Sequence, residues 1–88
     1  MHENVVEIVN RAGMHARPAS EFVKMAGTFK SEIRLEKDGM EVNGKSIMGV
    51  LMLAAECGAK LIIRVDGDDA EEAMGALTDL VQRGFEEE

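Results

Sequence analysis

Apolar residues in the first third of the chain follow a strand pattern and then a helical one. Residues 5–9 form a short segment rich in β-branched side chains, which predicts a strand. Residues 10–15 follow as a loop, and from Ala16 the apolar positions recur at the spacing of one helical face. That face comprises Ala19, Phe22, Val23 and Ala26. Pro18 is tolerated in the first turn of this helix, and Gly27 is expected to end it.

The next segment predicts a β-hairpin. Between residues 31 and 37, Ile33 and Leu35 alternate with charged residues, so one face of this strand is expected to be buried and the other solvated. Asp38 and Gly39 are a strong signal for a two-residue hairpin turn. Residues 40–42 then supply the short return strand.

The last half of the chain predicts two helices with a strand between them. Ser46 is expected to cap a helix of apolar residues that ends at Gly58. Residues 61–65 are β-branched and predict a strand. The acidic residues that follow Gly67 open a third helix, because negative side chains complement the positive end of its dipole. Its buried stripe is expected to be Ala70, Ala73, Met74, Leu77, Leu80, Val81 and Phe85.

Together these elements predict an α+β fold in the order β-α-β-β-α-β-α. A four-stranded antiparallel sheet with the helices packed on one face would bury every apolar stripe. The chain has 88 residues, of which 45% are hydrophobic, and this supports one core and a single domain over residues 1–88. Glu86, Glu87 and Glu88 follow the last stripe and are expected to form a frayed, solvated tail.

The composition disfavours several functional classes. The longest apolar run, residues 47–55, has nine residues, whereas a membrane span needs roughly 20. No secretory signal is visible, and a single cysteine fits a reducing cytosol, so we expect a cytoplasmic protein without a membrane segment. One cysteine and two histidines are too few for a structural zinc site, and we expect neither a metal nor a cofactor.

The charge is distributed unevenly along the chain. The net charge is −7; residues 1–48 hold seven basic and seven acidic residues, and residues 49–88 hold three and ten. The acidic second half disfavours nucleic-acid binding. An anionic substrate or an acidic partner should therefore meet the first half. Its basic residues are Arg11, Arg17, Lys24, Lys30, Arg34, Lys37 and Lys45.

His15 is the main candidate for chemistry, because it lies where the chain enters the first predicted helix. Free backbone N–H groups and the positive end of the helix dipole make that position an anion site. Arg17 adds a guanidinium that suits phosphate oxygens. The loop holds no second histidine and no carboxylate to activate water, so a phosphate carrier fits it better than a hydrolase. The alternative from the residues alone is that His15 caps the helix and Arg17 is a solvated charge.

Two segments resemble the signatures of one protein family. Residues 10–20 are similar to the active-site signature of HPr, the histidine-containing phosphocarrier of the bacterial phosphoenolpyruvate:sugar phosphotransferase system; they read Asn-Arg-Ala-Gly-Met-His-Ala-Arg-Pro-Ala-Ser. Residues 44–50, Gly-Lys-Ser-Ile-Met-Gly-Val, resemble the signature around the family's regulatory serine. Length and element order also agree, so the resemblance covers essentially the whole chain. Met14 stands where the family usually has Leu or Ile, a mild change in volume.

The resemblance implies an open-faced β-sandwich and a carrier that is not an enzyme. His15 would accept a phosphoryl group on Nδ1 from phosphorylated enzyme I and pass it to the IIA domains of sugar permeases. Arg17 would orient the phosphate, and the backbone amides of Ala16 and Arg17 would complete its cradle.

Ser46 is a second candidate site. A serine that opens a helix is usually an N-cap worth about 1 kcal/mol. The resemblance implies that HPr kinase/phosphorylase also phosphorylates it, which hinders phosphotransfer and promotes binding to a regulator of catabolite repression. Ile47, Met48 and Leu51 either pack in the core or, because their helix is apolar on most sides, remain partly exposed and dock partners.

Three other functions remain open. A phosphocarrier of a regulatory nitrogen branch would use the same chemistry, and the residues do not separate it from the sugar branch. A regulator that acts only through Ser46 phosphorylation and protein binding should lack the active histidine, so His15 disfavours it. A ferredoxin-like domain that binds a small molecule would leave His15 incidental. In each case we expect a monomer, because the chain has one small core and no heptads.

Overall fold

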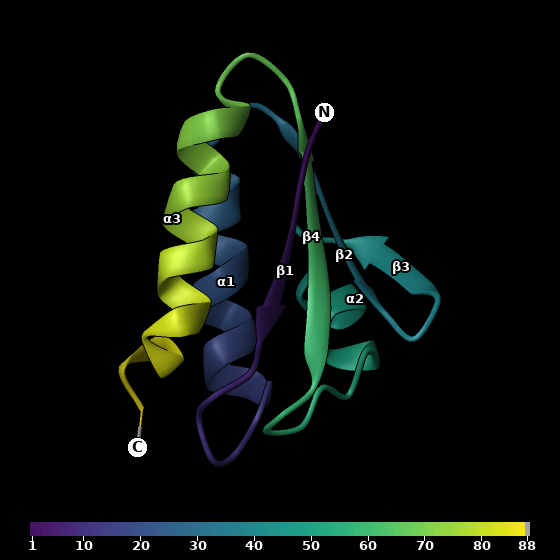
Figure 1. The fold of residues 1–88 in the computed structure, drawn as a ribbon, viewed down its shortest axis with the longest axis vertical. Coiled ribbons are helices and arrows are strands. Elements are labelled where there is room, and N and C mark those ends of the chain that lie inside the picture. The colour runs from purple at the N-terminus through teal and green to yellow at the C-terminus, as the bar shows by residue number, and fades with distance from the viewer. Residues whose placement is uncertain (88) are drawn as a thin grey trace.

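The computed structural model describes residues 1–87, and its elements follow the order that the sequence predicts (Figure 1). The strands are β1 (His2–Glu7), β2 (Glu32–Lys37), β3 (Met40–Asn43) and β4 (Lys60–Asp66). The helices are α1 (Ala16–Gly27), α2 (Ile47–Met52) and α3 (Ala70–Gln82), followed by the short 3-10 helix η1 (Gly84–Glu86). The α+β fold class is therefore confirmed.

The four strands form one antiparallel sheet in the order β1-β4-β2-β3. The register places Val6 opposite Leu61 and Ile33 opposite Val65, so apolar residues of neighbouring strands share one face. The alternation predicted for residues 31–37 is confirmed, because Ile33 and Leu35 are fully buried. Asp38 and Gly39 both have positive φ, 52° and 85°, as a tight hairpin turn requires.

All three helices cover the apolar face of the sheet, with α1 and α3 lying side by side along it (Figure 1). Phe22 of α1 and Leu77 of α3 are completely buried, and burial of each large apolar side chain contributes about 1.5–3 kcal/mol. The short helix α2 packs against α1 and β3. Between residues 1 and 87, none of the helices has both the length and the apolarity that a membrane crossing demands.

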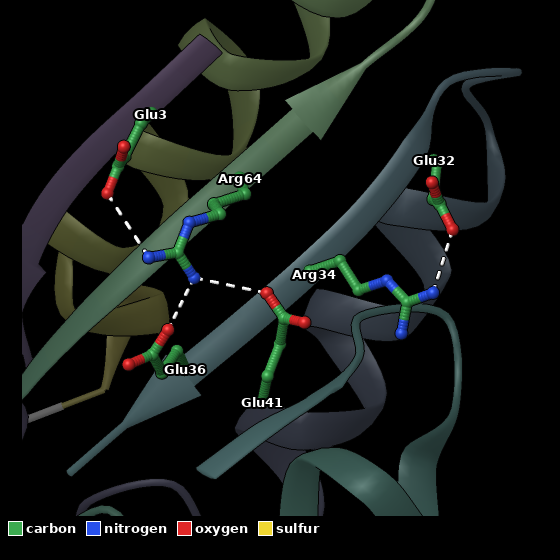
Figure 2. Close-up of polar contacts among 6 residues, drawn as sticks. All are labelled: Glu3, Glu32, Arg34, Glu36, Glu41 and Arg64. Carbon is green, nitrogen blue, oxygen red and sulfur yellow. Dashed lines mark hydrogen bonds and ion pairs between the residues drawn. The ribbon is translucent and has the colours of Figure 1, made fainter. Parts of the chain in front are cut away.

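The helix-free face of the sheet carries a network of charges that links all four strands (Figure 2). Arg64 of the central strand β4 donates to Glu36 of β2, to Glu41 of β3 at 3.1 Å and to Glu3 of β1 at 3.4 Å. Opposite charges on neighbouring strands favour this pairing. The network therefore supports the register of the sheet and places charged side chains on its outer face.

The strand β1 and the helix α2 differ clearly in extent from the prediction. β1 pairs with β4 from His2 to Glu7, whereas the sequence predicted a strand over residues 5–9. The first residues of this edge strand are exposed and polar, so an apolar pattern does not mark them. The helix α2 ends at Met52 rather than at Gly58, because Ala54 adopts a left-handed φ of 49° that turns the chain out of the helix.

The C-terminal segment is packed against the body of the protein. Gly84 and Phe85 have positive φ values of 66° and 56°, which redirect the chain after α3, so Phe85 fills the core from η1 and not from the helix. Glu86 is exposed, but the side chain of Glu87 is only 12% exposed. The prediction of a solvated tail is therefore wrong for Glu87. Glu88 lies outside the described residues.

Candidate functional site

His15 occupies the N-cap position of α1, yet its imidazole does not cap the helix. Its backbone is extended, with φ −93° and ψ −166°, and its side chain makes no hydrogen bond to the first turn. The imidazole is 42% exposed. The alternative that the side chain of His15 serves as a helix cap is therefore wrong, and the ring is available to a partner molecule.

The first turn of α1 offers unpaired donors beside this ring. Over residues 1–87, the N–H groups of Ala16 and Arg17 have no acceptor. Such groups, aligned with the helix dipole, form a natural anion site. The Arg17 guanidinium lies only loosely against Glu21, at 3.8 Å, and both side chains are exposed. The first turn can therefore hold an anion with two amides and one positive side chain.

An open depression surrounds the imidazole. It is lined by Arg11, Ala12, His15, Arg17, Glu86 and Glu87. Only two of the seven basic residues in the first half of the chain line this depression, Arg11 and Arg17. Arg34 pairs with Glu32 at 2.8 Å on the opposite, helix-free face of the sheet. The positive charge that the sequence concentrates in one half is thus divided between two faces.

The loop before His15 is anchored to the segment that follows α2. The Met14 N–H donates to the Ala55 carbonyl at 2.7 Å, and the Met14 side chain is buried. Gly13 has φ +73°, and a Cβ at this position would lie 2.6 Å from the Ala55 oxygen. A glycine is required here both by the backbone conformation and by the close approach. The two loops together fix where the chain enters α1.

Glu87 contacts His15 from 72 positions along the chain, and the sequence did not predict this contact. Both of its carboxylate oxygens lie 3.0 Å from His15 Nε2. The buried Asn10 amide donates to Glu87 Oε1 at 3.0 Å and to the Gly13 carbonyl at 2.8 Å. The hydrogen bond to the His15 imidazole, with that from Asn10, lowers the pKa of the Glu87 carboxyl despite its desolvation. Glu87 is therefore a carboxylate at neutral pH.

The only sequence signal for this contact is charge. The last three residues are glutamates, whereas Arg11, His15 and Arg17 lie in the loop before α1 and in its first turn. Opposite charge alone does not select one glutamate, and it does not reveal that the chain reverses at Gly84 and Phe85. Asn10 was likewise not identified as a site residue from the sequence.

Ser46 is the N-cap of α2, as predicted. Its backbone is extended, and its Oγ accepts a hydrogen bond from the Gly49 N–H at 3.2 Å. The side chain is half-buried. Neighbouring Lys45 donates from Nζ to the Phe29 carbonyl at 2.7 Å, so its charge points toward the end of α1 and not toward Ser46.

The apolar patch on α2 consists of Ile47, Met48, Leu51 and Met52. Ile47 is 38% exposed, Met48 67% and Met52 64%, whereas Leu51 is half-buried against the core. The alternative that these side chains pack in the core is therefore correct in part for Leu51 and wrong for Met48. Because the segment after α2 bonds to Met14, the patch lies on the element next to the His15 loop.

Metal chemistry finds no support in the part of the chain that the structure describes. Among residues 1–87, no three His, Cys, Asp or Glu side chains gather closely enough to hold a metal ion. The arrangement around His15 instead combines one nucleophilic ring, two free amides and a guanidinium. These groups suit reversible attachment of an anionic group to the imidazole.

Comparisons with known proteins agree with this geometry. A family model described as the phosphorylation site of the HPr component of the phosphotransferase system matches residues 2–83. The chain is 47% identical over 87 residues to the phosphocarrier protein HPr of Neisseria meningitidis serogroup A, covering 99% of this chain and 98% of that protein.

Solved structures of HPr and of an HPr-like protein are also similar to this chain. A crystal structure of HPr from Thermoanaerobacter tengcongensis matches with a TM-score of 0.96 and 48% identity, covering 100% of this chain and 99% of the other. A crystal structure of Crh from Bacillus subtilis, described as a catabolite-repression protein in a domain-swapped dimer, matches with a TM-score of 0.77 and 42% identity. That match covers 96% of this chain and 97% of the other.

Proposed function

The chain belongs to the HPr family of phosphocarrier proteins, and on that premise we propose that it carries a phosphoryl group on His15. Phospho-enzyme I is the donor, and IIA domains of sugar permeases are the acceptors. The observation that carries the proposal is the exposed imidazole at the start of α1, which does not cap the helix and lies beside Arg17 and two amides that have no acceptor among residues 1–87. The protein acts as a carrier and not as an enzyme.

Different groups at the first turn contact different atoms of the phosphoryl group. The imidazole supplies the nucleophilic nitrogen, and the phosphoryl oxygens lie toward the N–H groups of Ala16 and Arg17. The Arg17 guanidinium leaves its loose contact with Glu21 and pairs with the phosphoryl oxygens. This arrangement favours both the attachment of the group and its retention until an acceptor docks.

Intact mass measured after incubation with enzyme I, magnesium and phosphoenolpyruvate tests the proposal. We expect one added phosphate that is lost on brief acid treatment, and no addition to the variant His15→Ala. The histidine is exposed, so the variant should keep its thermal unfolding midpoint within a few degrees. An acid-labile phosphate on His15→Ala, or none on the wild type with an enzyme I that loads another carrier, would contradict the assignment.

Arg17 is tested by its effect on rate. Charge-assisted hydrogen bonds contribute about 1.5–3 kcal/mol, so Arg17→Ala should slow phosphoryl acceptance by roughly 10-fold or more while its thermal stability changes little. Lys24→Ala removes an exposed positive charge from the same helix away from the first turn and is the matched control. Equal rates for both variants would remove Arg17 from the site.

Regulation at Ser46 is a second proposed function. HPr kinase/phosphorylase transfers a phosphate to Ser46, and the product binds a regulator of catabolite repression. Support comes from the half-buried Ser46 hydroxyl beside the apolar patch and from the likeness to Crh. We expect an acid-stable phosphate on the wild type and on His15→Ala, but none on Ser46→Ala. A protein that takes up only this phosphate, and none on His15, would be the regulator-only alternative.

The apolar patch is the proposed docking surface for enzyme I and the kinase. Met48→Glu and Ile47→Glu should weaken enzyme I binding, because each places a charge among exposed apolar side chains. Val5→Glu is the control, since Val5 is 56% exposed and lies on the face of the edge strand β1 opposite to the buried Val6, which the helices do not cover. Unchanged binding by both patch variants would exclude this surface.

The pathway of the protein, its oligomeric state and its location in the cell remain predictions. The identity of the IIA domain that accepts the phosphate separates the sugar branch from the nitrogen branch. Sedimentation should give a monomer of 9.6 kDa, and a stable dimer, as described for Crh, would refute that expectation. Fractionation of cells should recover the protein in the cytoplasm.

A further inference from the structure

Buried residues hold both segments that form the contact between Glu87 and His15. On one side, Phe85 is buried and anchors the C-terminal segment, while the positive φ of Gly84 and Phe85 directs the following residues toward α1. On the other side, the Asn10 amide is 1% exposed and holds Glu87 Oε1 and the Gly13 carbonyl together. The carboxylate is therefore oriented by the same loop that presents His15.

This contact distinguishes the two ring nitrogens of His15. A carboxylate is an acceptor only, so the proton of a neutral imidazole that faces it belongs on Nε2. In a neutral ring with its proton on Nε2, the lone pair is on Nδ1. Across residues 1–87, Nδ1 has no hydrogen-bond partner. The geometry therefore leaves Nδ1 open to a phosphoryl donor.

We propose that Glu87 is a positioning residue for phosphoryl transfer: its carboxylate holds the Nε2 proton, leaves Nδ1 as the nucleophile and neutralises the ring when Nδ1 bonds to phosphorus. This inference rests on the proposed phosphocarrier function. It extends that function by assigning a role to a residue outside both sequence signatures.

The transfer step balances without any further reactant. The Nδ1 lone pair forms a bond to phosphorus, and the bond between phosphorus and the donor breaks, with its electron pair returning to the donor. The proton stays on Nε2, so the His15 ring becomes a cation. Glu87 faces that cation at 3.0 Å and compensates its charge. In the reverse direction, the cationic ring is a good leaving group for transfer to an acceptor.

Glu87 has a control in a glutamate outside the depression around His15. Glu72 is exposed in the first turn of α3, at the opposite end of that helix from η1. The variants Glu72→Gln and Glu87→Gln change the net charge of the chain equally. Any difference between them therefore reports the contact with the imidazole and not the overall charge.

The first readout is the ¹⁵N chemical shifts of the neutral His15 ring, which measure the fraction with its proton on Nε2. We expect that fraction to fall in Glu87→Ala, and to be kept in Glu87→Gln because the amide oxygen still accepts the proton. Glu72→Gln should match the wild type. An unchanged fraction in Glu87→Ala would overturn the positioning role.

The second readout is the rate of phosphoryl acceptance from enzyme I. We expect both Glu87→Ala and Glu87→Gln to be slowed about 10-fold, since neither compensates the cationic ring, while Glu72→Gln stays within about twofold. Equal slowing in Glu72→Gln and Glu87→Gln would assign the effect to net charge and refute the proposal. If the wild type accepts no phosphate, the carrier function fails, and the chemical shifts alone still decide whether Glu87 sets the ring proton.

Discussion

Gly13→Ala tests whether the His15 loop is held rigidly against the segment after α2. The substitution adds one carbon to a residue with φ +73°, and that carbon would lie 2.6 Å from the Ala55 oxygen and 3.0 Å from the Glu56 Cα. The neighbouring atoms are backbone and have little freedom to move. The Ala55 oxygen also accepts the Met14 N–H at 2.7 Å, so displacing it weakens that hydrogen bond.

The expected loss of stability has two parts. A left-handed conformation costs a residue with a Cβ about 1–2 kcal/mol. Weakening a buried hydrogen bond and shifting two backbone segments adds about 1–2 kcal/mol. The smaller entropy of an unfolded chain with alanine returns about 0.4–1 kcal/mol. The net loss should be about 2–3 kcal/mol, or roughly 8–24 °C in the unfolding midpoint for a domain of this size.

Gly39→Ala measures the cost of the left-handed conformation without the cost of the close backbone contact. Gly39 also has positive φ, 85°, but a Cβ there meets nothing within 4 Å. Urea unfolding followed by far-UV circular dichroism suits a chain without Trp or Tyr. We expect Gly39→Ala to lose about 1 kcal/mol and Gly13→Ala at least twice as much, with equal m-values. If Gly13→Ala loses no more than Gly39→Ala, the close packing of the two loops is not rigid and the reasoning fails.

Three further substitutions test the fold around this site. Phe22→Ala removes a fully buried ring and should cost about 3–5 kcal/mol in urea unfolding; a loss below 1 kcal/mol would contradict its place in the core. Ser46→Ala removes the acceptor for the Gly49 N–H and should cost about 1 kcal/mol by the same assay, and no loss would contradict the cap. Hydrogen bonds from the Ser31 hydroxyl and the Lys30 N–H lower the pKa of Asp69. The stabilisation by its carboxylate is therefore present above its ordinary pKa of 3.8 and lost as pH falls through the lower folded pKa. Asp69→Asn should be less stable than the wild type at pH 7, and this deficit should shrink towards pH 2; a deficit independent of pH would exclude the carboxylate as its cause.

Local patterns determined most of the fold. The alternation at Ile33 and Leu35 and the Asp38-Gly39 turn specify a hairpin within a few residues, and the structure confirms both. The helical spacing from Ala16 gives the first helix with both of its ends. These features are predictable because the period of burial and the φ requirement of a turn act on neighbouring residues.

The errors lie where distant segments decide the local structure. The polar start of β1 is a strand only because β4 pairs with it, from His2 opposite Val65. The apolar run after Ser46 suggests a long helix, but the chain turns out of the helix at Ala54, and the Ala55 carbonyl then bonds to Met14. Here a tertiary contact outweighs helix propensity.

The same division applies to the site. The sequence by itself determined that His15 opens a helix and that Arg17 follows it in the first turn, because both lie within one signature. Only the tertiary structure decided that Glu87 faces Nε2 of that histidine, held by Asn10. A contact between residues 72 positions apart depends on the reversal at Gly84 and Phe85 and on the burial of the Phe85 ring. No local pattern encodes that distance, since it results from how α3 packs on the sheet.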